Sequence, residues 1–520
     1  MTSLAYLPRD VLVEILSYFC LHCRGDLRPA KGLGTPHQQK RWREPQQSDQ
    51  KSWYSIDKYT LFSLAASCKS LHAVAEDILY HDFAPGYGDS ELSELYTYGH
   101  RLNQFMRTVG TRKDLAEKVR MVFVHPQHSN ADVEQTVLSL KQGAADLGID
   151  IAKGWRHRAE DVLNNYNSAP RGSERPEQLD YIFMLNSAFT DEIFDYLARK
   201  HTVMTDEFYR ALHHELIPML IALLPKLDHI IYKDKTRFSM FDHSAFEALG
   251  VTEFPDLRTL EIDYDAFSIL ERAPHLTQVD FLSPPFSSLS ETVGDSFGDQ
   301  SKIKTLRLQD IYGSVRLNMS LSYAAKDLRS LVIESYRKRV HKLDLFTWPN
   351  FSAETIEKVR NYRHSLEILH LDLRGNFDEG FNSYRPDSTF QDFERLQHIL
   401  LSTQLIFDIS RQLKVEDRYA ITRLLPPSIV SLHLVWGGTK LNRSARYRPE
   451  STIVNRFKQG LLGLAAAATS DFQNLRFVGI DYTKGVDATV EEAIRRAGIE
   501  FAYESWPVPY TIEPDEPDDV

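Results

Sequence analysis

The 520-residue chain is 42% hydrophobic and carries a formal net charge of −11, of which five negative charges lie in the C-terminal segment "EPDEPDDV". This length allows two or more domains or one long repeat array, and the mildly acidic remainder argues against a nucleic-acid-binding protein, which would need a basic patch. No stretch of about 18 apolar residues occurs, so the sequence predicts no membrane span.

The first predicted helix lies in "LPRDVLVEILSYF", residues 7–19. Pro8 suits the first turn of a helix, where a missing N–H leaves no donor unpaired. The apolar residues that share one helical face are Val11, Leu12, Ile15, Leu16 and Phe19. Charges within this stretch argue against a secretion signal, and the three cysteines form no disulfide framework. We therefore expect a cytoplasmic or nuclear protein.

The segment at about 21–55 is rich in Gln, Gly, Pro, Lys and Arg and shows neither a helix nor a strand period. Such a composition is typical of a flexible loop, so we expect an insertion here. Two more helices are expected in "SIDKYTLFSLAASCKSLHAVAEDILYHDF", residues 55–83, with Leu61 and Leu64 on the first and Leu71 and Val74 on the second.

The stretches "LPRDVLVEIL" and "SCKSLHAVAEDILY" resemble the F-box, which opens with LP-x-E/D-x-L-x-x-I-L and has Cys-Lys-x-Leu at the start of its last helix. The chain departs from the family in the long insertion between the first two helices. The resemblance implies that residues 1–83 form a three-helix domain that binds a Skp-family adaptor, which connects F-box proteins to a cullin and its RING partner. The implied adaptor-binding residues are Leu7, Pro8, Val11, Leu12, Ile15, Leu16, Leu61, Leu64, Leu71 and Val74.

Residues 84–226 show mixed helix-period patterns with one strand-like run, "KVRMVFVHP". From residue 227 to about 505 the pattern Leu-x-x-Leu-x-Leu recurs, with other apolar residues substituting for Leu. Nine instances begin at residues 227, 257, 276, 303, 328, 366, 396, 429 and 475, and "VRMVFV" at 119 is a possible tenth. This array resembles the degenerate leucine-rich repeats of fungal and plant F-box proteins, in which each unit adds one strand to a parallel sheet on the inner face of an arc.

A single Leu-x-x-Leu-x-Leu instance would fit a buried strand of any α/β protein, but nine in succession favour a repeat array. The predicted fold class is therefore an α/β solenoid. It comprises an N-terminal three-helix F-box (1–83), a mostly helical connecting region (84–226), an irregular leucine-rich-repeat arc (227–505) and a disordered acidic tail (506–520).

Three short motifs are weak candidates for chemistry. "CLHC" at 20–23 has C-x-x-C spacing, but zinc needs four ligands and no second pair follows at zinc-finger spacing; Cys68 is expected to be a small buried residue. "HHELIP" at 213–218 has Pro where H-E-x-x-H needs its second His. "GDSFG" at 294–298 fits G-x-S-x-G but lacks a preceding strand. We predict no catalytic residue, no cofactor and no metal ion.

The residues that alternate with the buried Leu positions are expected on the concave face of the arc. The predicted substrate-binding residues are Glu261, Asp263, Asp280, Arg307, His370, Asp372, His398 and His433, and the wider set adds Gln309, Glu334, Phe477 and Asp481. The three acids nearest the start would favour a basic partner, and the histidines would make binding pH-sensitive. A solvated sheet face, with substrates bound by loops or by the acidic tail, is the alternative.

The resemblance implies a non-catalytic substrate-recognition subunit of a Skp/cullin/F-box ubiquitin ligase, which binds a protein substrate of unknown identity through the array. Two alternatives stay open. One is an interaction scaffold that is not coupled to ubiquitination, which co-purification of a cullin would distinguish. The other is an enzyme within residues 90–226, which a thermal-shift screen with metals and nucleotides would detect.

Overall fold

The computed structural model describes residues 4–24, 53–85, 101–124, 133–168, 215–232, 243–263, 267–283, 302–309, 321, 324–334, 356–372, 389–403, 405–406, 416–436, 450–481 and 486–503. Most of the predicted insertion and the acidic tail lie outside these ranges. The chain divides into two compact units, with the boundary between Leu276 and Thr277. This boundary lies within the predicted array rather than at its start.

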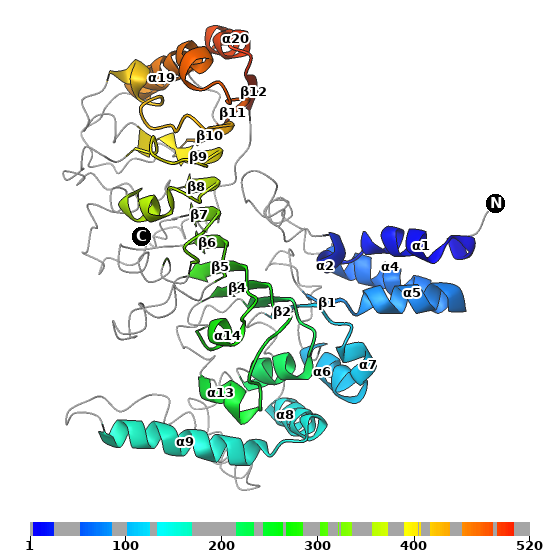
Figure 1. Ribbon diagram of the computed structural model, residues 1–520. Helices are drawn as coiled ribbons and strands as arrows, with labels where there is room; N and C mark the ends of the chain where they lie inside the picture. Colours follow the sequence, from blue (N-terminus) through cyan, green and yellow to red (C-terminus); the bar gives the residue numbers. More distant parts are fainter. Residues whose placement is uncertain are drawn as a thin grey trace, which may run out of the picture. The chain divides into compact units, whose positions relative to one another are not determined.

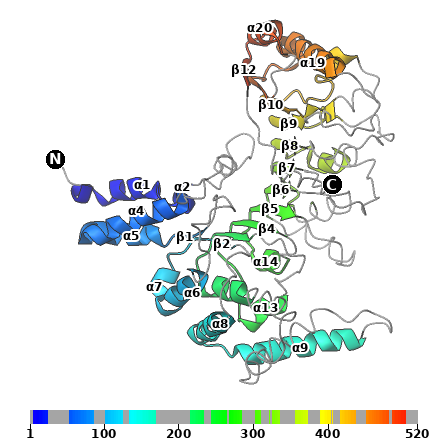
Figure 2. The same ribbon diagram turned by 180° about the vertical axis from the view of Figure 1, so that it is seen from behind.

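The first unit begins with helices α1 (Arg9–Ser17), α2 (Leu21–Arg24), α4 (Trp53–Ser67) and α5 (Lys69–Leu79). Pro8 directly precedes α1, and Asp10 in its first turn interacts favourably with the helix dipole. Figures 1 and 2 both show α1, α4 and α5 side by side. The expectation of an irregular loop over 21–55 is wrong at both ends, because α2 and the start of α4 are helical there and Arg24 pairs with Asp57 at 3.1 Å.

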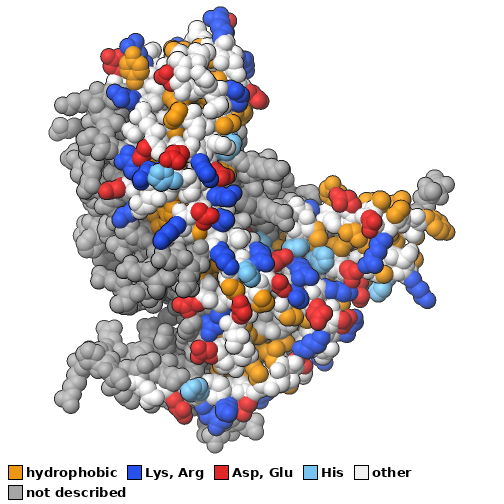
Figure 3. Space-filling view, viewed as in Figure 1, with side chains coloured by type: hydrophobic (Ala, Val, Ile, Leu, Met, Phe, Trp, Pro, Cys, Tyr) orange, Lys and Arg blue, Asp and Glu red, His pale blue; other side chains and the backbone are white. Residues whose placement is uncertain are grey.

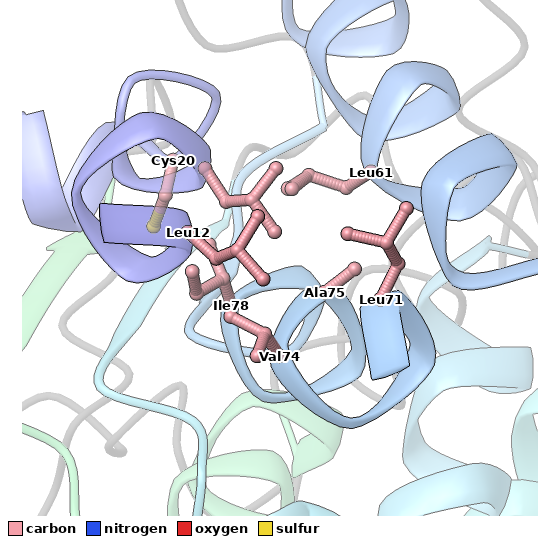
Figure 4. Close-up of a cluster of buried hydrophobic side chains, with 8 residues drawn as sticks. Leu12, Cys20, Leu61, Leu71, Val74, Ala75 and Ile78 are labelled. Carbon is pink, nitrogen blue, oxygen red and sulfur yellow. The ribbon is translucent and has the colours of Figure 1, made fainter. Parts of the chain in front are cut away.

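These helices bury a common apolar core, in which the side chains of α1 point toward those of α4 and α5 (Figure 4). The buried residues of this core are Leu12, Leu16, Cys20, Leu61, Leu71, Val74, Ala75 and Ile78. Leu7, Phe19 and Leu64 pack against its edge. Helices of this length are marginal in isolation, so their stability depends on this shared burial.

The strands of the first unit pair in parallel in the order β1 (Asp82–Phe83), β2 (Met121–Val124), β3 (His229–Tyr232) and β4 (Thr259–Asp263). The other helices of this unit are α6 (Arg101–Thr111), α7 (Lys113–Ala116), α8 (Val133–Leu147), α9 (Ile151–Ser168), α13 (His243–Ala248) and α14 (Phe267–Arg272), and residues 215–223 are also helical. Gly148 ends α8 with φ of 71°, a left-handed conformation that favours glycine.

The second unit contains eight described strands, each paired in parallel with the next (Figure 2). They are β5 (Gln278–Ser283), β6 (Thr305–Gln309), β7 (Ser330–Glu334), β8 (Ile368–Asp372), β9 (His398–Ser402), β10 (Ser431–Val435), β11 (Phe477–Ile480) and β12 (Glu500–Tyr503). Helix α19 (Glu450–Asp471) precedes β11, and α20 (Ala488–Arg496), whose N-cap is Asp487, precedes β12.

The strands of the second unit are aligned so that apolar residues form continuous buried rows. One row consists of Val279, Leu306, Leu331, Leu369, Ile399, Leu432, Val478 and Phe501. Each member occupies the second Leu position of its Leu-x-x-Leu-x-Leu motif, except Phe501 of β12. The repeat in the sequence therefore becomes a stack of equivalent side chains.

The described residues thus contain twelve strands, and within each unit the strands pair in parallel in the order of the chain. The strands predicted in the nine motifs and in the possible tenth are confirmed. The expectation that the array begins at residue 227 is wrong, because β1 and β2 already belong to the parallel ladder that contains β3. No helix within the described ranges is long and apolar enough to cross a membrane.

The shared helical core predicts a large stability cost when Leu16 is truncated. Leu16 is fully buried, so Leu16→Ala removes methyl groups from a packed site and should cost about 2–5 kcal/mol in unfolding free energy. Val13→Ala is the matched control, because Val13 lies on the same helix and is 39% exposed; its effect should stay within about 0.5 kcal/mol. Urea unfolding followed by circular dichroism measures both, and equal losses would contradict this core.

Candidate functional site

The predicted adaptor-binding residues separate into two groups in the structure. Leu12, Leu16, Leu61, Leu71 and Val74 are buried within the helical core, so the expectation that they form a contact surface is wrong for these five. Their apolar faces are turned toward one another, and they hold the helices together. Pro8 and Val11 are exposed, while Leu7, Ile15 and Leu64 are partly buried.

Other large apolar side chains are exposed on these helices. Val11 and Val13 are about two-fifths exposed on α1, and Ile56, Tyr59 and Phe62 lie on α4, where Tyr59 is 71% and Phe62 59% exposed. Figure 3 shows hydrophobic side chains interspersed with charged ones over the surface of the helices α1, α2, α4 and α5, at the right of the view. These side chains form part of the exposed apolar surface of the N-terminal helices.

The predicted substrate-binding residues lie on the strands, but most are buried. The expectation of a solvent-facing surface is wrong for Glu261, Asp280, Arg307, His370, Asp372 and His433, each at most 7% exposed. Asp263 is the last residue of β4, and its side chain lies outside the described set. Side chains alternate between the two faces of each strand as expected, but at these positions the side chains on both faces are buried.

Arg307 organises the buried charges of β5 to β7. Its guanidinium donates to Glu334 Oε2 from Nη2 at 2.7 Å and from Nε at 3.0 Å, and to Asp280 Oδ2 from Nη1 at 3.3 Å. Gln309 also donates to Asp280, and His370 Nε2 lies 3.9 Å from Glu334 Oε1. In the first unit, His229 Nε2 lies 3.4 Å from Glu261 Oε1. These ionisable and polar side chains therefore lie against one another inside the protein.

Solvent reaches this face of the second unit near the amino ends of the strands. The row two residues before Arg307 is partly exposed at Gln278, Thr305, His398 and Phe477. His398 Nδ1 lies 2.8 Å from Ser431 Oγ. Burial, together with the neighbouring His433, lowers the pKa of His398 below its ordinary value. Of the predicted substrate residues with described side chains, only His398 is partly exposed.

A cluster of possible metal ligands lies where α2 approaches the end of α5. Cys20 precedes α2, His22 and Cys23 belong to it, and His81 follows α5; their ligand atoms all lie within 4.8 Å of one another. Cys23 Sγ is 3.1 Å from His81 Nδ1 and 3.9 Å from His22 Nδ1. We refer to these four residues as the Cys/His cluster.

Interactions within the Cys/His cluster and with its neighbours shift the pKa values of three of its residues. Hydrogen bonds from Cys20 and then from His22 and His81 outweigh burial and lower the pKa of the Cys23 thiol far below its usual range. The interaction with Cys23, followed by burial and the Asp82 carboxylate, raises the pKa of Cys20. Burial opposes the charged form of His22, but its hydrogen bonds to Asp228 and Cys23 prevail and raise its pKa to about 9.

Sequence reasoning missed His81, because no rule of ligand spacing connects it to the "CLHC" stretch far upstream. The expectation that Cys68 is buried is also wrong, since Cys68 is exposed. Ser296 of "GDSFG", together with His213 and His214, lies outside the described residues.

No model of a known protein family matches this chain, and no curated protein matches it either.

Breaking the Arg307 network should strongly destabilise the protein. Arg307→Met leaves Asp280 and Glu334 buried without the guanidinium, which should cost about 3–5 kcal/mol in unfolding free energy. Arg329→Met is the control, because Arg329 is 53% exposed and its pair with Glu367 should be worth less than about 1 kcal/mol. Urea unfolding distinguishes the two, and adding Glu334→Gln to Arg307→Met should recover part of the loss.

The lowered pKa of His398 predicts a loss of stability in acid. The unfolded chain protonates this imidazole at a higher pH than the folded protein does. The contribution of His398 to the free energy of unfolding is therefore fully present above about pH 6.5 and decreases as the pH falls below that value. His398→Gln should therefore reduce the difference between urea midpoints measured at about pH 7.5 and about pH 5.5. An unchanged difference would show that the imidazole is protonated equally in both states.

Proposed function

We propose that this chain is the substrate-recognition subunit of a Skp/cullin/F-box ubiquitin ligase and is not itself a catalyst. The observation that carries the proposal is the coincidence of motif and core. The stretches "LPRDVLVEIL" and "SCKSLHAVAEDILY" supply α1 and α5, and their apolar residues meet in one helical core with α4. This is the arrangement that the resemblance to the F-box implies.

The exposed apolar side chains of α1 and α4 support adaptor binding. Tyr59 and Phe62 bring large apolar surfaces into water, a costly arrangement that a partner helix would relieve. Aromatic residues of this kind commonly dominate the affinity of protein interfaces. The adaptor surface that we propose therefore includes Val11, Tyr59 and Phe62, together with Pro8, which is exposed at the start of α1.

The parallel strands support the receptor half of the proposal. Stacked repeats hold side chains in rigid rows, so a partner that binds them loses little conformational entropy from the receptor. The buried charged residues in the middle of the strands pair with one another. The partly exposed row near the strand starts, with Gln278, Thr305 and His398, is the part that a protein substrate would contact. An F-box and a repeat array in one chain would connect substrate to ligase.

The adaptor surface can be tested without disturbing the helical core. Val11→Glu/Phe62→Glu should weaken binding to a purified Skp-family adaptor roughly a hundredfold or more, because burying one such side chain contributes about 1.5–3 kcal/mol and each 1.4 kcal/mol is about tenfold in affinity. Leu138→Glu is the matched control, because Leu138 is 52% exposed on α8, away from this surface in sequence. Isothermal titration calorimetry measures the adaptor affinity of wild type, of the double variant and of the control.

The coupling to ubiquitination is tested separately by adding a cullin to the adaptor complex. Retention of the cullin by wild type, and its loss with the double variant, would support a ligase subunit. Adaptor binding without cullin retention would instead identify an interaction scaffold. Undiminished adaptor binding by the double variant, in a protein with wild-type unfolding, would refute the proposed surface.

A further inference from the structure

The Cys/His cluster has the composition and dimensions of a metal site. In tetrahedral zinc sites Zn–S is about 2.3 Å and Zn–N about 2.0 Å, which gives ligand-to-ligand distances of roughly 3.3–3.8 Å. The four donor atoms here lie within 4.8 Å of one another, so small side-chain movements would complete such a site. We propose that Cys20, His22, Cys23 and His81 bind one structural Zn²⁺ ion.

Local backbone geometry directs the two sulfurs and the two imidazoles to one point. Cys20 and Cys23 are three residues apart across a helical turn, so their side chains lie on the same side of α2. Cys23 Sγ already lies 3.1 Å from His81 Nδ1 and 3.9 Å from His22 Nδ1, distances close to those between ligands of one ion. The two imidazole nitrogens that face the sulfurs are the ones that bind the metal.

The surroundings of the Cys/His cluster match those of metal ligands. Histidine ligands usually donate their other ring N–H to a carboxylate, and His22 Nε2 lies 2.9 Å from Asp228 Oδ2. This contact leaves His22 Nδ1 free to coordinate. Cys20 Sγ is 3.1 Å from Asp82 Oδ1, and Lys58 Nζ lies 2.8 Å from the same oxygen, so a cation balances the carboxylate beside the sulfur.

Charge and ligand type select zinc over other common ions. A divalent ion displaces the protons of its ligands, and the resulting two thiolates and two neutral imidazoles make a neutral site with it, which suits a location where Cys20 is buried and the other three are partly buried. Sulfur and nitrogen donors in tetrahedral array favour zinc, whereas magnesium and calcium require oxygen ligands. Four protein ligands leave no open position, so the ion stabilises structure and does not catalyse.

The ion would connect the helical core to the strands of the first unit. Cys20 belongs to the helical core, whereas Leu21 packs with Met121, Phe123 and Ile231 of β2 and β3. His81 lies between α5 and β1. A metal bound here joins α2 to the junction of α5 and β1, and because it binds the folded state it raises stability.

Metal content and spectroscopy of the full-length protein test the site. Purified, reduced wild type should contain about one zinc per chain by mass spectrometry of metals. Replacement by Co²⁺ should give the intense visible bands of tetrahedral cobalt and a sulfur-to-cobalt charge-transfer band. Cys23→Ser and His81→Asn should each lose both signals, whereas Cys68→Ser should keep them, since Cys68 is exposed outside the Cys/His cluster.

A second variant addresses the site without removing a ligand. Asp228→Asn should lower zinc affinity roughly tenfold to a hundredfold in competition with a chromogenic chelator, because a carboxylate orients its histidine better than an amide does. Full metal content in Cys23→Ser and His81→Asn would overturn the proposal. Reduced wild type that binds neither zinc nor cobalt, or that binds cobalt without sulfur charge transfer, would overturn it as well, even if the ligand variants failed to fold.

Discussion

The in-register parallel pairing of short strands is the constraint on which the rest of the structure depends. Each Leu-x-x-Leu-x-Leu motif must place its apolar residues in the same rows as its neighbours, as Leu306, Leu331 and Leu369 do in β6, β7 and β8. A slip by one residue would turn these side chains to the opposite face and bring charged residues into their place. The spacing between motifs varies, and the described residues between β5 and β12 that lie outside the strands take no part in the ladder.

The same register determines what happens to the charged residues. Asp280 and Arg307 are directly paired across β5 and β6, and Glu334 lies on β7 beside Gln309. A charge buried in such a row requires a partner, and strand pairing brings a carboxylate to each side of the guanidinium. The buried charged residues on β5, β6 and β7 therefore contribute rigidity by pairing with one another, whereas the row near the strand starts is partly exposed.

The sequence predicted the strands and the helices α1, α4 and α5 because their periods are strong and local. It missed β12, which has no full motif, and β1, whose two residues are too short to show a period. Strand alternation also predicted which residues share a face, but not that Asp280 and His370 are buried, because burial depends on contacts with distant residues. His81 was missed for the same reason: folding alone brings it to Cys23.

The junction between the helices and the first strands follows from the small size of the helical core. A few short helices bury too little apolar area to be stable alone, so they need support from the ladder. Tyr54 of α4 supplies part of this support, since its hydroxyl donates to the carbonyl of Asp82 and accepts from the N–H of Ala84. Lys58 donates to the carbonyl of Leu79 and to Asp82. With the inner side anchored in this way, the apolar side chains of Val11 and Phe62 remain exposed on the helices, so the proposed adaptor surface is separate from the residues that hold the core together.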